Sequence, residues 1–139
     1  LLSLIAFIAV FAFGKAFYQD ENEPWAKKQL IEPADLASQL KDVQHKKPVL
    51  LSIGPGGGIP GSVEFGNAKD SENLVKLKNY IDKLPKDDDI VVYCGCCPFE
   101  HCPNIRPAFK LLNEMKFSNH KLLNLSHNPN VIGSIKGVR

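Results

Sequence analysis

Short apolar runs, separated by charged or Pro- and Gly-rich segments, recur along most of the chain. The runs over 48–53 and 90–93 are rich in branched apolar residues and are bounded by turn residues, which indicates buried strands. The run over 121–125 predicts one more strand. A helical pattern precedes each of the three. Such alternation over short connections is typical of an α/β domain with a mainly parallel sheet and helices on its faces.

The helical patterns have apolar residues at intervals of three and four positions. The first spans 31–42 and carries Pro33 in its first turn, a position that proline favours. The second spans 70–84, and the third starts at Pro107. We expect Trp25, which precedes the first helix, to pack the start of the domain onto the core.

The first thirteen residues carry no charge, whereas a membrane-spanning helix needs about 20 apolar residues. Small residues at Gly14 and Ala16 suit signal-peptidase cleavage after Ala16. We predict a signal peptide over 1–16, a linker over 17–24 and one domain over 25–139. We also expect the sequence to begin inside the leader, so the alternative is an uncleaved membrane anchor. The protein is therefore expected in the periplasm or another exported location, with membrane contact only through this segment.

Net charge and motif spacing argue against two classes of function. The chain has 139 residues, and its 17 basic and 15 acidic side chains leave a net charge of +2. This balance lacks the basic excess of a nucleic-acid-binding protein. The Gly-rich segment over 54–61 is followed by Ser62 and Val63, whereas a P-loop needs Lys followed by Ser or Thr. We interpret this segment as a tight connector.

All four cysteines lie between Cys94 and Cys102, in the loop that joins the 90–93 strand to the Pro107 helix. In an open parallel sheet, ligands bind beyond the carboxyl ends of the strands. Backbone N–H groups and the positive end of the next helix lower the pKa of a thiol placed there, and Arg106 adds a positive charge. The loop therefore suits a nucleophilic thiolate.

Three interpretations of this loop remain open. A nucleophilic cysteine could carry sulfur as a persulfide that flanking thiols resolve, with no cofactor. A soft metal ion could instead bind Cys94, Cys97, His101 and Cys102, although structural zinc sites usually combine two separated ligand pairs. In the third, Cys97 pairs with Cys94 or Cys102 in a structural disulfide. The other histidines lie in polar segments and are expected at the surface: His45, His120 and His127.

The order of these segments resembles the rhodanese-like family. The matching motifs are I-x-P-x-x-L at 31–36, G-x-I-P-G at 57–61, I-V-V-Y-C at 90–94 and a closing F-x-N motif at 117–119. The loop pattern C-G-C-C-P-x-x-x-C-P-N-I-R-P is similar to that of exported bacterial members. The chain departs from the family in its cysteine loop, which is about five residues longer, and in lacking Asp-x-Arg after the first strand.

The resemblance implies a three-layer domain, with a central, mostly parallel sheet and helices on both faces. It also implies a sulfurtransferase or thiol-redox protein in which Cys94 carries the persulfide and Arg106 stabilises the anionic sulfur. Cys96, Cys97 and Cys102 are then supporting or alternative thiols. The expected partners are a small sulfur donor, a thiol acceptor and a candidate redox protein. The alternative function is an inactive module that binds a metal or a protein through the loop.

Overall fold

The computed structural model describes residues 23–55 and 58–125. The predicted leader over 1–16, most of the linker and His127 lie outside these residues, as does the end of the predicted domain. In the described part, no helix has the length and apolar character that crossing a membrane requires.

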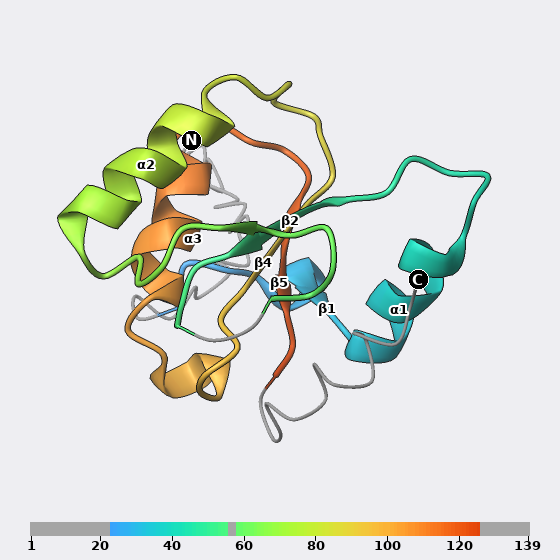
Figure 1. The fold of residues 1–139 in the computed structure, drawn as a ribbon, viewed down its shortest axis with the longest axis horizontal. Helices are drawn as coiled ribbons and strands as arrows, with labels where there is room; N and C mark the ends of the chain where they lie inside the picture. Colours follow the sequence, from blue (N-terminus) through green and yellow to red (C-terminus); the bar gives the residue numbers. More distant parts are fainter. Residues whose placement is uncertain (1–22, 56–57, 126–139) are drawn as a thin grey trace, which may run out of the picture.

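A five-stranded sheet lies at the centre of the described residues, and all of its strand pairs are parallel (Figure 1). The strand order is β1-β5-β4-β2-β3. The strands are β1 (Leu30–Ile31), β2 (Val49–Ser52), β3 (Val63–Glu64), β4 (Ile90–Tyr93) and β5 (His120–Leu123). The predicted parallel sheet is confirmed, and β4, which carries the cysteine loop, is its middle strand.

Helices cover both faces of this sheet, as the sequence predicted (Figure 1). Helices α2 (Ser71–Ile81) and α3 (Ile105–Glu114) pack on one face, and α1 (Pro33–Lys41) packs on the other. Two short 3-10 helices, η1 (Lys27–Gln29) and η2 (Phe99–His101), lie in connections. The three-layer α/β architecture is therefore confirmed.

Alternate residues of β4 point into two different cores, as the twofold period of a strand requires. Ile90 and Val92 join the larger core beneath α2 and α3, together with Cys94. Val91 and Tyr93 join the smaller core beneath α1. Because β4 is buried on both faces, its sequence is a continuous apolar run without polar alternation.

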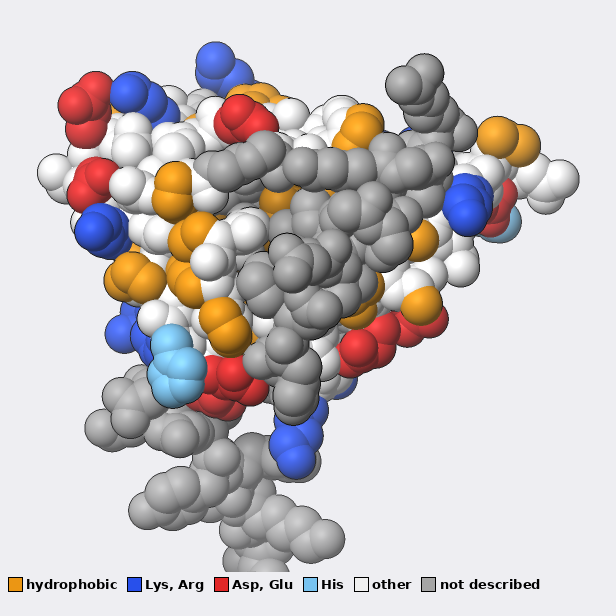
Figure 2. Space-filling view, turned by 60° about the horizontal axis from the view of Figure 1, so that its bottom comes forward, with side chains coloured by type: hydrophobic (Ala, Val, Ile, Leu, Met, Phe, Trp, Pro, Cys, Tyr) orange, Lys and Arg blue, Asp and Glu red, His pale blue; other side chains and the backbone are white. Residues whose placement is uncertain are grey.

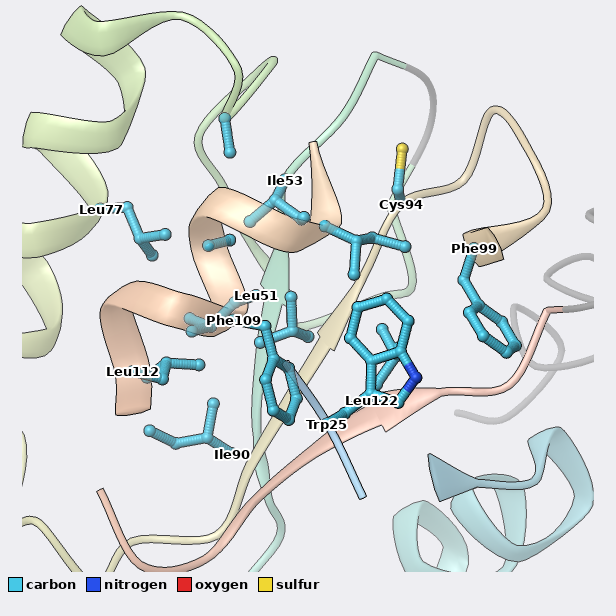
Figure 3. Packing of buried hydrophobic residues seen from close by; sticks show 14 of the residues in the cluster. Trp25, Leu51, Ile53, Leu77, Ile90, Cys94, Phe99, Phe109, Leu112 and Leu122 are labelled. Atoms are coloured by element: carbon cyan, nitrogen blue, oxygen red, sulfur yellow. The ribbon is translucent and has the colours of Figure 1, made fainter. Parts of the chain in front are cut away.

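Trp25 closes the larger core, as expected, and is only 4% exposed. Its ring meets those of Phe99 and Phe109 edge to face, at centroid distances of 5.6 and 5.8 Å (Figure 3). Phe99 belongs to the cysteine loop, so this aromatic group anchors the loop to the sheet and to α3.

Three local predictions need correction. Ile31 pairs in β1 and does not belong to the first helix, which begins at Pro33. Strand β3 over 63–64 was missed, because two residues are too few to show a period. Helix α3 begins at Ile105, two residues before Pro107. Pro107 still lies in the first turn, where a backbone N–H has no helical acceptor.

The prediction for His120 was wrong, because this residue is buried in β5 and only 4% exposed. Its Nε2 lies 2.7 Å from Asn113 Oδ1, and its ring packs against Phe109 at 4.6 Å. Burial lowers the pKa of the imidazole. The polar residues around it in sequence indicated exposure, but pairing with Ile90 places it inside the sheet.

Charged side chains of both signs are interspersed around the described part on the face shown in Figure 2, where the visible side chains form no continuous basic stripe. This distribution agrees with the small net charge of the sequence.

Candidate functional site

Cys94 lies directly after β4, at the carboxyl end of the middle strand of the sheet. The neighbouring backbone is held by the bond from Ile53 N–H to the Tyr93 carbonyl oxygen, 3.0 Å long. The Cys94 side chain is 1% exposed, and its sulfur points away from the packed apolar side chains (Figure 3). The sheet therefore fixes the position of this thiol.

The loop brings the sulfur atoms of all four cysteines within 4.8 Å of one another. We call Cys94, Cys96, Cys97 and Cys102 the thiol cluster. Cys96 Sγ lies 3.2 Å from Cys94 Sγ and 3.3 Å from Cys97 Sγ. All four are free thiols; Cys94 and Cys102 are buried, Cys97 is half-buried and Cys96 is exposed. The cluster thus extends from the core to the surface.

The surroundings shift the pKa values of three thiols of the cluster in different directions. The pKa of Cys94 is lowered to about 5, chiefly because the Cys102 thiol donates to it; the Cys96 N–H and the Asn104 amide contribute, and burial opposes them. Donation to Cys94 raises the pKa of Cys102 far above its usual range. Burial, with hydrogen bonds to Cys94 and Cys97, raises the pKa of Cys96 to about 12. Of these three thiols, Cys94 is therefore the one whose surroundings favour the thiolate.

Asn104 is a site residue that the sequence did not reveal. It is 3% exposed, and its Nδ2 donates toward Cys94 Sγ at 3.8 Å. Its Oδ1 accepts the Lys69 backbone N–H at 3.1 Å, which orients the amide. Asn104 precedes α3, where asparagine usually caps the helix, but its side chain makes no cap hydrogen bond. The sequence signal therefore indicates a different role from the observed one.

Gly54 is a second residue with an unexpected place in the site. A Cβ atom added to it would lie 2.2 Å from Cys94 Sγ, so any larger residue would displace the thiol. The sequence indicated only a tight connector here. One signal could have found it: Ser52 pairs with Tyr93, so Gly54, two residues after the end of β2, must lie close to the residues that follow β4.

Tyr93 fixes the end of the Gly-rich connector, on the other face of β4. Its hydroxyl accepts the Ile59 N–H at 2.7 Å and donates to Ser62 Oγ at 2.8 Å. The ring is fully buried beneath α1. This part of the Gly-rich segment is therefore held by the strand that carries Cys94.

Arg106 connects the cysteine loop to Trp25. Its Nη2 donates to the Glu100 carbonyl oxygen at 2.9 Å, and its guanidinium lies over the Trp25 ring, 5.5 Å from the centroid. The expected role of Arg106 in stabilising an anionic sulfur on Cys94 stays a prediction. The contacts with Glu100 and Trp25 show that Arg106 holds η2 against the aromatic group around Trp25.

Within residues 23–55 and 58–125, the side chains that lie close enough together to hold a metal ion are the four cysteines of the thiol cluster. Three of them were predicted, but Cys96 takes the place that the sequence assigned to His101. His101 is exposed in η2. A cluster of this composition suits either the binding of a soft metal ion or thiol redox chemistry.

The sequence matches no family model, no curated protein and no solved structure in these comparisons. The resemblance to the rhodanese-like family therefore stays a prediction, and the function must be argued from the thiol cluster itself.

Proposed function

We propose that the protein is a rhodanese-like sulfurtransferase that carries sulfane sulfur on Cys94 as a persulfide. The observation that carries the proposal is the setting of Cys94 Sγ. The sheet holds this sulfur in place, the Asn104 amide lies 3.8 Å from it, and three further thiols lie within 4.8 Å. A nucleophile held in register with donors to its anion needs little reorganisation to react.

In the loading step the Cys94 thiolate attacks the outer sulfur of a donor such as thiosulfate. A bond forms between Sγ and that sulfur, the sulfur–sulfur bond of thiosulfate breaks, and sulfite leaves with the electron pair. The product is an anionic persulfide with the same charge as the thiolate. The donors that stabilise the thiolate can therefore stabilise the product as well.

Release of the sulfur can use a neighbouring thiol, because Cys96 Sγ lies 3.2 Å from Cys94 Sγ. Attack by the Cys96 thiol on Cys94 Sγ forms a disulfide and breaks the persulfide bond, and the thiol proton passes to the departing sulfur, which leaves as hydrosulfide. An external dithiol then reduces the disulfide and is itself oxidised, which gives the expected redox partner its role.

The test is mass spectrometry of reduced, chelator-treated protein after incubation with thiosulfate or inorganic polysulfide. We expect the chain to gain one sulfur atom, and Cys94→Ser to gain none. Cys97→Ser is the matched control, because Cys97 lies in the same loop but is not the residue at the end of β4; it should still load. No gain with either donor, or an unchanged gain in Cys94→Ser, contradicts the proposal.

A further inference from the structure

The separations within the thiol cluster match those of a tetrahedral metal site. Zinc–sulfur bonds of about 2.3 Å place the four sulfurs of a tetrahedron about 3.8 Å apart. In the structure, all four sulfurs lie within 4.8 Å of one another, and the Cys94–Cys96 and Cys96–Cys97 separations are 3.2 and 3.3 Å. Each edge therefore needs to change by no more than about 1 Å to enclose a zinc ion.

Two of the four sulfurs are held by the fold. Cys94 directly follows β4, and Cys102 is fully buried, with its N–H bonded to the Phe99 carbonyl oxygen at 3.2 Å. Cys96 and Cys97 lie on the loop between these positions and are more exposed. The site thus has two preformed ligands and two ligands that can adjust to an ion, so little of the binding energy is lost in ordering it.

The surroundings can stabilise the negative charge of a four-thiolate site. Four thiolates and one divalent cation leave a net charge of −2, which needs nearby donors. The Asn104 Nδ2 points to Cys94 Sγ at 3.8 Å, and the positive end of α3 begins three residues after Cys102. Hydrogen bonds of this kind orient metal ligands and contribute to metal affinity.

The ligand chemistry selects the kind of ion. Thiolates bind Zn²⁺ and Cu⁺, whereas Mg²⁺ and Ca²⁺ require oxygen ligands. Four cysteine sulfurs at distances compatible with tetrahedral coordination are typical of a structural zinc site. We propose that the thiol cluster binds one Zn²⁺ ion through Cys94, Cys96, Cys97 and Cys102.

This inference goes beyond the proposed sulfur transfer. A bound ion would occupy the electron pair of Cys94 Sγ with which the thiolate attacks the donor. The zinc-bound protein should therefore not load sulfur, and the metal-free protein should. Because loading is measured on chelator-treated protein, either proposal can fail while the other holds.

The test is titration of the full, reduced and chelator-treated chain with Co²⁺, whose absorption reports both tetrahedral geometry and thiolate ligation. We expect d–d bands of a tetrahedral ion together with sulfur-to-cobalt charge-transfer bands, saturating at one ion per chain. Added Zn²⁺ should abolish both sets of bands, because zinc prefers this ligand set. Spectra without charge-transfer bands, or bands of an octahedral ion, overturn the proposal.

Two variants decide whether the four named sulfurs are the ligands. Cys96 is exposed, so Cys96→Ser should fold normally and still weaken Co²⁺ binding by at least about tenfold. His101→Ala changes the exposed histidine of the same loop and should leave the spectrum and the affinity unchanged. An unchanged affinity in Cys96→Ser, or a loss of binding in His101→Ala, overturns the assignment.

Discussion

Tyr93 and Cys94 are adjacent in the sequence, but their side chains lie on opposite faces of the sheet and make different kinds of contact. The Tyr93 hydroxyl is fully engaged, because it accepts from Ile59 and donates to Ser62. The Cys94 sulfur is surrounded by groups that favour its anion and by thiols that can react with it. One end of β4 thus anchors a connector on one face of the sheet and presents the thiol cluster on the other, and the direction of the side chain decides which.

The largest contrast should come from paired substitutions at these two positions. Cys94→Ser should lose all sulfur loading and keep the fold. Tyr93→Phe should keep loading but lose about 1–3 kcal/mol of unfolding free energy, because the Ile59 N–H is left without its buried acceptor. Mass spectrometry and urea denaturation measure the two effects. Loss of loading in Tyr93→Phe would show that the two faces are coupled.

The close approach of Gly54 to Cys94 gives the next largest effect. Gly54→Ala places a Cβ 2.2 Å from the sulfur, so the thiol must rotate away from Asn104 or the ends of β2 and β4 must separate. We expect a loss of at least about tenfold in the rate of loading and about 1–3 kcal/mol in stability.

Gly61→Ala is the control for that substitution. A Cβ at Gly61 meets no atom within 4 Å, but its φ of 86° strains any other residue. This variant should lose about 1 kcal/mol of stability through its backbone and still load at the normal rate. Equal losses of loading in both variants would mean that stability, and not contact with the thiol, controls the reaction.

The pH dependence of alkylation tests whether the hydrogen bond from Cys102 lowers the pKa of Cys94. Only the thiolate reacts, so a lowered pKa makes Cys94 reactive at lower pH; in metal-free protein its rate should rise with a midpoint of about pH 5. Cys102→Ala removes the largest stabilising donor and should move the midpoint to higher pH. Cys102→Ser keeps a donor and should move it less. Iodoacetamide labelling followed by peptide mapping measures the midpoint, and equal midpoints in both variants would contradict this cause.

The smallest effect is expected at Arg106. Arg106→Ala removes the hydrogen bond to the Glu100 carbonyl oxygen and the contact with Trp25, so the loop is held less firmly. Loading should slow a few-fold. Arg106→Lys keeps the charge but lacks the planar group that packs on the ring, and should recover only part of the rate. Full recovery would instead assign the effect to charge alone.

Local patterns in the sequence were sufficient for most of the fold. β2, apart from Ser52, and β4 are apolar because both faces of the sheet are covered. The three helices repeat their apolar residues at helical spacing. The same patterns placed Cys94 at the end of a strand. Two-residue strands such as β1 and β3 have no period of their own, so only their pairing with β5 and β2 defines them.

The sequence by itself determined that four thiols share one loop at the carboxyl end of a buried strand, since these are properties of neighbouring residues. The tertiary structure decided which groups meet there. Gly54 and Asn104 lie far apart in the chain, and only the pairing of β2 with β4 and the packing of α3 bring both to the Cys94 sulfur. It also decided that Cys96 joins the cluster and that His101 is exposed, because the path of a loop depends on contacts such as Phe99 with Trp25. Local preferences act over a few residues, whereas the acidity of a buried thiol depends on every donor that packing places around it.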